Sequence, residues 1–290
     1  MEPMSSAFIP KNPIVAAYPK NPEAFAEAET IASYLKEKGF SAPHGSLYDE
    51  ALRRNVRRGD YDLLIVLGGD GSMLRAGHLC APSGVPILGI NLGRVGFLIQ
   101  VDRADWKAYL EKLLKGEAWI ENRMMLEASH LRAGETLGNW QALNDVVVGR
   151  GATMRPVHLT ASVDGRQLTS YVADGLIAAT PTGSTAYALA AGGPILPPEL
   201  RNILLVPIAP HLSVDRAVVL AEGSSVSIHI HSENTVLSVD GQAPVNILED
   251  DRVEVRAAEI TAQFVRFGDP GYFYRNLTAH MNENSLGLPR

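Results

Sequence analysis

The residue in this chain whose setting most clearly suits chemistry is Asp70, in the stretch GGDGS at residues 68–72. Gly68, Gly69 and Gly71 bring no side chain to the turn, so the main chain can approach a ligand closely. A carboxylate in a turn that suits a phosphate is electrostatically unfavourable unless a metal ion or a proton transfer uses it. Asp70 is therefore predicted either to hold Mg²⁺ or to accept a proton from an attacking hydroxyl. An ordinary turn in which Asp70 caps the following helix is the alternative.

The elements that position Asp70 are a strand before it and a helix after it. The unbroken apolar run at 63–67, LLIVL, predicts a strand buried on both faces. A helical pattern follows, with Ser72 in the position of its cap. This strand, turn and helix direct main-chain N–H groups and a helix N-terminus at one point, which suits a phosphate. The stretch matches neither GxxxxGK[ST] nor GxGxxG, so two commoner nucleotide motifs are excluded here.

A second glycine-rich turn, GINLGRVGFL at 89–98, follows another strand predicted at 85–91. Together with the first strand and helix it completes a β-α-β unit, which implies a doubly wound sheet. Phe97 in this turn fits two roles, covering a flat ligand ring or packing in the core.

Two later stretches carry polar groups that suit a nucleoside. In LND at 143–145, the Asn144 amide can donate to and accept from a base edge, and Asp145 can accept from two ribose hydroxyls; a loop turn is the alternative. In DGLIAATPTGSTAYALAAGGPIL at 174–196, an apolar run leads into small hydroxyl residues and Tyr187, which can stack or hydrogen-bond.

Composition limits the class of protein. The 290 residues are 46% hydrophobic, which is enough for substantial cores, and the net charge of −6 argues against a nucleic-acid partner. No apolar run has membrane-spanning length, nothing at the N-terminus resembles a signal peptide, and Cys80 has no second cysteine to pair with. We expect a soluble, cytoplasmic protein without a membrane partner.

The periodicity divides the chain near residue 120. Helices predicted at 21–39, 48–56 and 104–114 alternate with strands in residues 1–120, which form an α/β domain with a doubly wound, mostly parallel sheet, joined by residues 270–290. Residues 121–269 alternate with period 2 and contain a hairpin around Asp164-Gly165, which predicts a β-rich, antiparallel, sandwich-like domain. His229 and His231 share one strand face there, and exposed strand residues are favoured over a metal site.

Four motifs taken together resemble the NAD kinase family of bacterial type: GGDGSMLRA at 68–76, PILGINLGRVGFL at 86–98, LND at 143–145 and DGLIAATPTGSTAYALAAGGPI at 174–195. PIAPHLSVDRAVVL at 207–220 and VDGQ at 239–242 also match. The resemblance implies transfer of the γ-phosphoryl of ATP, or of polyphosphate, to the 2′-hydroxyl of the adenosine ribose of NAD, giving NADP. It also implies Mg²⁺ and a homodimer or homotetramer.

By motif position the resemblance implies that Asp70 is the proton acceptor, and we predict no particular metal ligand. Residues expected to bind NAD or ATP are Gly68, Gly69, Gly71, Arg75, Phe97, Asn144, Asp145, Arg155, Asp174, Thr182, Thr185, Ala186, Tyr187, Ala190 and Gln242. Asp145 stands where the family commonly has Glu, and Ala190 where Ser is frequent.

Two alternatives remain open at this point. A diacylglycerol-type lipid kinase would share the GGDG turn but leaves residues 182–187 without a purpose. A regulator that binds dinucleotides without catalysis would not need Asp70.

Overall fold

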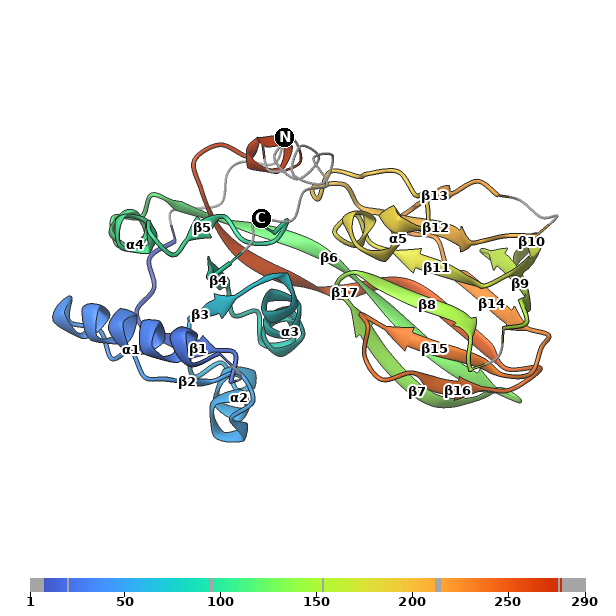
Figure 1. Ribbon diagram of the computed structural model, residues 1–290, viewed down its shortest axis with the longest axis horizontal. Coiled ribbons are helices and arrows are strands. Elements are labelled where there is room, and N and C mark those ends of the chain that lie inside the picture. The colour runs from blue at the N-terminus through green and yellow to red at the C-terminus, as the bar shows by residue number, and fades with distance from the viewer. Residues whose placement is uncertain are drawn as a thin grey trace. The chain divides into compact units, whose positions relative to one another are not determined.

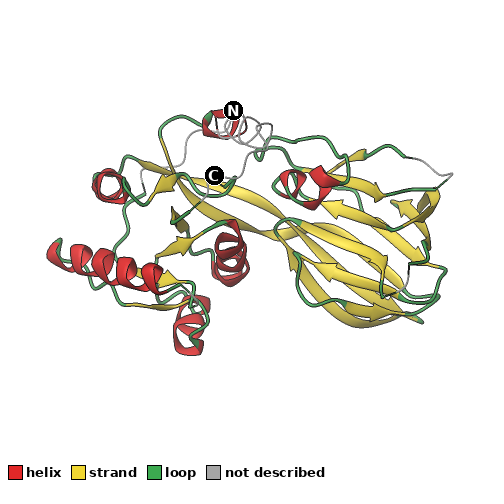
Figure 2. Cartoon of the chain, viewed as in Figure 1, coloured by secondary structure: helices red, strands yellow, loops and turns green. Residues whose placement is uncertain are grey.

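The computed structural model describes residues 8–19, 21–93, 96–152, 154–211, 215–275 and 277. The chain forms two compact units: unit 1 comprises Met1–Asn122 and Ala262–Arg290, and unit 2 comprises Arg123–Thr261. The sequence-based division had assigned 121–122 and 262–269 to the second domain, whereas here they belong to unit 1. The helices lie mostly in unit 1, and unit 2 is almost entirely strand (Figure 1 and Figure 2).

Unit 1 is built on a parallel sheet. Its strands β1 (Pro13–Ala17), β2 (His44–Ser46), β3 (Leu63–Gly68) and β4 (Ile87–Asn91) lie in the order β2-β1-β3-β4, and β5 (Val101–Asp102) pairs with β4. The last strand of the chain, β17 (Arg252–Phe267), joins the other side of β4 at Phe264. The apolar runs of β1 and β3 are buried along their whole length, because both faces of the sheet are covered.

Helices cover the two faces of this sheet. On one face α1 (Pro22–Glu37) and α4 (Trp106–Leu114) share a core with alternate residues of β3 and β4. On the other face α3 (Asp70–Cys80) packs so closely that Met73 leaves no room for a side chain at Gly89. α2 (Glu50–Arg57) contacts α3 and the short helix η1 (Ala81–Ser83). The predicted doubly wound α/β domain is therefore confirmed.

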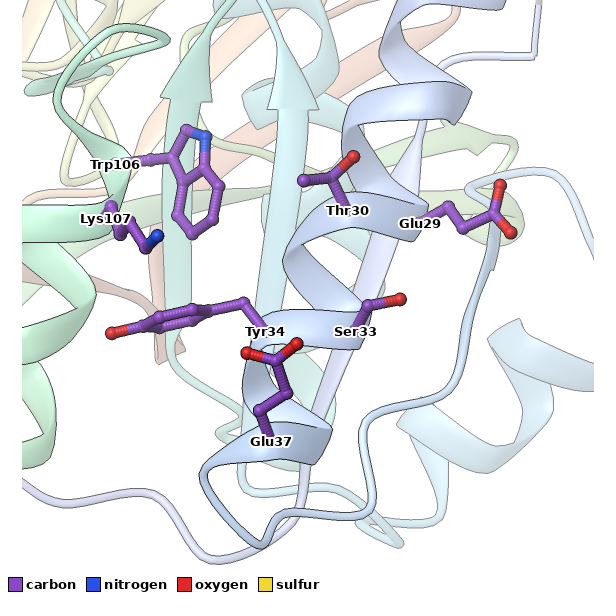
Figure 3. A pocket seen from close by; sticks show the side chains of 7 residues that line it. All are labelled: Glu29, Thr30, Ser33, Tyr34, Glu37, Trp106 and Lys107. Carbon is purple, nitrogen blue, oxygen red and sulfur yellow. The ribbon is translucent and has the colours of Figure 1, made fainter.

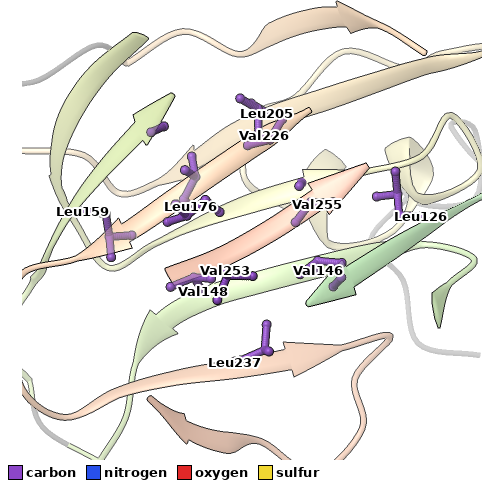
Figure 4. Packing of buried hydrophobic residues seen from close by; sticks show 14 of the residues in the cluster. Leu126, Val146, Val148, Leu159, Leu176, Leu205, Val226, Leu237, Val253 and Val255 are labelled. Atoms are coloured by element: carbon purple, nitrogen blue, oxygen red, sulfur yellow. The ribbon is translucent and has the colours of Figure 1, made fainter. Parts of the chain in front are cut away.

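Unit 2 is a sandwich of two antiparallel layers. One layer has the strand order β13 (Val218–Ala221), β12 (Asn202–Ile208), β11 (Gly175–Ala179), β8 (Asp145–Arg150), β15 (Thr235–Val239) and β16 (Val245–Ile247). The other layer orders β10 (Arg166–Ala173), β9 (Val157–Val163), β14 (Val226–Ile230) and β17; β6 (Ala118–Arg132) pairs with β17 and with β7 (Glu135–Ala142). Inward side chains of both layers fill one core (Figure 4). The predicted antiparallel half and its hairpin are confirmed.

β11 is buried on both faces, which matters for the segment that follows it. Leu176 and Ala178 point into the sandwich core, whereas Ile177 and Ala179 pack under Ala188 on the opposite face. The cover on that face comes from η2 (Gly183–Thr185), α5 (Tyr187–Ala190) and the residues after them. The hydroxyl-rich motif is thus held against the sheet by its own apolar members.

The helical spacing of residues 273–281 also predicts a C-terminal helix, which lies only partly within the described residues. Residues 272–275 and 277 are helical, and the remainder of the prediction lies outside the described residues. No helix among the described residues is long and apolar enough to span a membrane.

In unit 2 the buried carboxylate of Asp251 connects the end of β6 with the segment that precedes β17. The Asp251 side chain, fully buried, accepts from Arg132 Nε at 2.7 Å and Nη2 at 2.9 Å, from the Leu248 N–H at 2.8 Å, and lies 2.7 Å from His130 Nε2. The hydrogen bonds from Arg132, and then those from Leu248 and His130, hold the pKa of Asp251 well below its usual range against the opposing effect of burial.

We predict that Asp251→Asn lowers the free energy of unfolding by about 1.5–3 kcal/mol, because it removes the charge-assisted hydrogen bonds that the buried carboxylate makes with Arg132 and the Leu248 N–H. The neighbouring Asp250→Asn, at an exposed side chain, should change it by less than about 0.5 kcal/mol. The carboxylate stabilises fully above its unfolded pKa of about 3.9 and loses this effect as pH falls through the lower folded value, so the difference from wild type should shrink in acid. Urea unfolding at several pH values measures this; equal losses in both variants would contradict it.

Candidate functional site

The Asp70 turn lies where β3 ends and α3 begins. Gly69 is the N-cap of α3 and makes no side-chain cap bond, and Asp70 is the first helical residue. The prediction that Ser72 caps this helix is wrong: Ser72 is buried within the first turn, and its N–H donates to the Gly69 carbonyl at 2.8 Å. The helix starts three residues earlier than expected, with an acidic residue in its first turn, where the helix dipole favours negative charge.

The Asp70 carboxylate is held by the second glycine-rich turn. Oδ2 accepts from the Phe97 N–H at 2.8 Å and Oδ1 from the Leu98 N–H at 3.1 Å. Gly96 permits this approach, since a β-carbon there would lie 2.0 Å from Oδ1. Asp70 therefore does not act as a cap; its carboxylate is oriented by main-chain donors from a neighbouring turn. Each oxygen keeps a lone pair that a further hydroxyl can use.

The other residues predicted in unit 1 lie around this turn. Gly69 and Gly71 are exposed beside Asp70, and Arg75 donates to the Gly71 carbonyl at 3.1 Å. The Arg75 guanidinium also lies 5.8 Å from the ring centres of both Tyr18 and Tyr48. Phe97 is half-buried, with its ring 6.4 Å from that of Phe273. Its main-chain N–H, rather than its ring, makes the contact with Asp70.

In unit 2 the loop at Asn144 and Asp145 is fixed by Asp240. The N–H groups of Leu143, Asn144 and Asp145 all donate to the Asp240 carboxylate, at 2.7, 2.8 and 2.8 Å. Asp240 has a positive φ of 49° in the VDGQ turn, and its own N–H returns a bond to the Asp145 carbonyl. Sequence analysis missed Asp240, although the Asp-Gly pair in this turn was a signal that could have pointed to it.

The hydroxyl-rich motif contacts the same loop. Thr180 donates through Oγ1 to the Leu143 carbonyl at 2.5 Å and through its N–H to the Asn144 carbonyl at 2.8 Å. Gly183 lies so close to this loop that a β-carbon there would be 2.0 Å from the main-chain carbonyl oxygen of Asn144. Thr182 is buried and accepts from Arg123 Nη1 at 3.1 Å, and Thr185 donates to the Thr182 carbonyl at 3.1 Å. The structure thus brings the predicted Asn144, Asp145, Thr182 and Thr185 together, along with Thr180, which was not predicted.

Asp145 is a buried carboxyl group in an unfavourable setting for charge. Burial, with a smaller contribution from the negative charge of Asp240, raises the pKa of Asp145 to about 7. No cationic side chain pairs with it in the part of the chain that the structure describes. The group can therefore change its protonation state near neutral pH.

A hollow of about 330 Å³ in unit 2 is lined by Asp174 and Tyr187 among the predicted residues. Arg150, which was not predicted, lies in the same hollow with its Nε 3.1 Å from Asp174 Oδ1. Ala186 precedes α5, whereas Ala190, at its end, Gln242 and Arg155 are exposed. Arg155 is not among the residues that line the hollow.

A pocket in unit 1 and a histidine pair in unit 2 contain no predicted site residue. The pocket lies between α1 and α4, around Tyr34 and Trp106 (Figure 3). The rings of His229 and His231 lie 4.5 Å apart. No three His, Cys, Asp or Glu side chains among the described residues are grouped so that they could hold a metal ion.

Family models match most of the chain in two consecutive pieces. The ATP-NAD kinase N-terminal domain matches residues 15–118, and the ATP-NAD kinase C-terminal domain matches residues 143–267. The NAD kinase of Heliobacterium modesticaldum is 44% identical over 224 residues, which cover 77% of this chain and 78% of that protein. The NAD kinase of Citrifermentans bemidjiense is 38% identical over 265 residues, covering 87% and 92%.

Solved structures agree with these relatives. Yeast NADH kinase complexed with NADH superposes with a TM-score of 0.84 at 25% identity, covering 100% of this chain and 94% of the yeast chain. An NAD kinase from Archaeoglobus fulgidus in complex with ATP gives 0.73 at 26% identity, covering 92% and 97%. The lipid kinase and the non-catalytic regulator are not favoured by these matches. The chain therefore belongs to the ATP-NAD kinase family, and its activity is that of an NAD⁺ kinase, a phosphotransferase.

Proposed function

We propose that Asp70 is the proton acceptor when the 2′-hydroxyl of the adenosine ribose of NAD attacks the γ-phosphorus of ATP. The hydroxyl O–H bond breaks as its proton passes to Asp70, the new O–P bond forms, and the bond from phosphorus to the β-phosphate oxygen breaks, releasing ADP and NADP. The observation that carries the proposal is the pair of hydrogen bonds from Phe97 and Leu98, which leave the carboxylate oriented and able to accept one more donor.

The remaining predicted residues have binding roles in this proposal. Gly68, Gly69 and Gly71 present main-chain N–H groups at the start of α3 to a phosphate, and Arg75 adds a positive charge beside them. In unit 2, Asn144 and Asp145 bind adenosine and ribose groups. Thr182, Thr185 and Asp174 contribute polar groups to the dinucleotide site, and the main chain at Ala186 and Ala190, the Tyr187 ring, Arg155 and Gln242 complete it. The support for Arg155 and Gln242 is the family resemblance alone.

Mg²⁺ belongs to the proposal as a companion of the triphosphate. Mg²⁺ is usually bound by phosphate oxygens, water and one or two carboxylates, and the family resemblance supports its place in the reaction. When bound, the ion neutralises negative charge on the phosphates. ATP is the proposed donor, with polyphosphate as the alternative, and we also propose a cytoplasmic homodimer or homotetramer.

We predict that Asp70→Asn lowers turnover by at least about 10²-fold, because a general base typically contributes 10²–10⁴. The affinity for NAD should stay within a small factor, since proton transfer is not part of ground-state binding. An assay that detects NADP formed from NAD, ATP and Mg²⁺ measures the turnover. Asp105→Asn, at an exposed helix cap without a side-chain bond, is the control. Unchanged turnover in Asp70→Asn would refute the assignment.

A second prediction concerns the turn that orients Asp70. Gly96→Ala should lower turnover by about 10²-fold with little change in the KM for NAD, since the added β-carbon would lie 2.0 Å from Asp70 Oδ1 and must displace the carboxylate. Gly93→Ala in the same turn places its β-carbon in open space and should stay within about twofold of wild type. Equal turnover in the two variants would show that the position of the carboxylate does not limit the reaction.

A third prediction follows from the raised pKa of Asp145. If ribose hydroxyls donate to its carboxylate form, NAD binding below pH 7 must release the proton, about 0.9 per site at pH 6. Affinity should then rise by up to about tenfold per pH unit below pH 7 and level off above it. Calorimetric titration in buffers of different ionisation enthalpy counts the released protons, and Asp145→Asn should abolish this release. Binding without proton release in the wild type would exclude the carboxylate contact.

A further inference from the structure

An ion pair is buried in unit 1 beside the turn that holds Asp70. Arg266, near the end of β17, donates from Nε to Glu121 Oε2 of β6 at 2.8 Å, and their side chains are 1% and 9% exposed. Tyr272 donates its hydroxyl to the same carboxylate, 3.0 Å from Oε1 and 2.9 Å from Oε2. The guanidinium is stacked with its centre 4.7 Å from that of the Tyr272 ring and 5.2 Å from that of the Phe264 ring. These contacts fix both the position and the plane of the Arg266 side chain.

The same guanidinium also bonds to the main chain of the turn whose N–H groups bind the Asp70 carboxylate. Arg266 Nη1 donates to the Leu98 carbonyl at 3.0 Å, and the Leu98 N–H is one of the two donors to Asp70. Two residues further, Gln100 bonds through its side chain to both the N–H and the carbonyl of Phe267, at 3.0 and 2.8 Å. Residues 98–100 are therefore attached to two consecutive residues of β17.

Stability alone is a weak reason for this ion pair. Removing two charges from water costs several kcal/mol per ion, and apolar residues of similar volume often serve a fold as well or better. The Nη2 atom of Arg266 is also buried without a hydrogen-bond partner among the described residues, which adds to the desolvation cost. What apolar side chains cannot supply is a directed hydrogen bond to the Leu98 carbonyl.

We propose that Arg266, held by Glu121 and Tyr272, is a positioning residue for phosphoryl transfer, because it sets the turn whose N–H groups orient Asp70. Arg266 touches neither the carboxylate nor any reacting atom; it acts through Leu98. The inference rests on the proposed role of Asp70 as the proton acceptor.

The test replaces the ion pair by apolar side chains of similar length. Arg266→Met combined with Glu121→Met leaves the Tyr272 hydroxyl and the Leu98 carbonyl without their partners, so the variant should be less stable than wild type. It should lower kcat by about 10–100-fold and keep the KM for NAD within about threefold. Arg266→Lys keeps the charge but cannot reach Glu121 and Leu98 together, so it should also lose turnover with an unchanged KM. If the double variant does not fold, the kcat and KM of Arg266→Lys test the proposal instead.

A matched control lies on the same two strands. Arg256 of β17 pairs with Glu127 of β6 at 3.0 Å, with side chains 67% and 31% exposed. Replacing both by Met should leave kcat within about twofold of wild type. An equal loss of kcat in this control and in the buried pair would overturn the proposal.

Combining the substitutions with Asp70→Asn separates this proposal from the proposed function. If Arg266 acts through Asp70, removing the buried pair in the Asp70→Asn background should lower the residual rate no further. If the combined variant instead loses turnover by the product of the two separate fold-losses, the positioning role is overturned. Full turnover in the Arg266 and Glu121 variants beside an inactive Asp70→Asn also overturns it while leaving Asp70 as the base. Full turnover in Asp70→Asn itself refutes the proposed function instead.

Discussion

Two main-chain N–H groups, those of Phe97 and Leu98, decide where the Asp70 carboxylate points. They can reach it because β3 and β4 are neighbouring parallel strands whose register pairs Gly68 with Asn91. The segments that follow these strands therefore start at the same edge of the sheet, and residues 97–98 lie beside Asp70. Register is set by the apolar residues that each strand buries, so the packing of the sheet determines the orientation of the acid. A shift of either strand by one residue would separate the carboxylate from its donors.

Unit 2 uses the reverse arrangement, in which a carboxylate orients main-chain groups. Asp240 collects the N–H groups of residues 143–145, and it can do so because β8 lies between β11 and β15. The pairs of Ala179 with Asp145 and of Val239 with Val146 bring the hydroxyl-rich motif and the VDGQ turn to one end of the sheet. In both units the candidate site residues are held by hydrogen bonds from a distant segment of the chain. In unit 1 these bonds hold the Asp70 side chain, and in unit 2 they hold the main chain of residues 143–145.

The sequence indicated the local parts of this arrangement and not the bonds that connect them. The strand, glycine turn and helix around Asp70 were predictable because apolar runs, glycines and helical spacing act over a few residues. The predicted helix start was wrong by three residues because Asp70, between glycines, takes the first helical position. The partners of Asp70 are 27 and 28 residues away and those of Asp240 are 95 to 97 residues away. Main-chain donors carry no residue type, so no pattern of side chains could have pointed to them. The pairing of Glu121 with Arg266, across 145 residues, needed the fold for the same reason.

Two buried aspartates of unit 2, Asp251 and Asp145, have opposite surroundings and opposite pKa shifts. Asp251 meets Arg132, His130 and the Leu248 N–H, so its charge is satisfied within the protein and its pKa is lowered. Asp145 is buried beside a second carboxylate, and its pKa is raised instead. Burying a carboxyl group beside another carboxylate costs free energy. A ligand that donates hydrogen bonds to the carboxyl group would offset this cost, and ribose hydroxyls are donors of this kind. The unfavourable setting of Asp145 therefore supports the proposal that this residue takes part in binding.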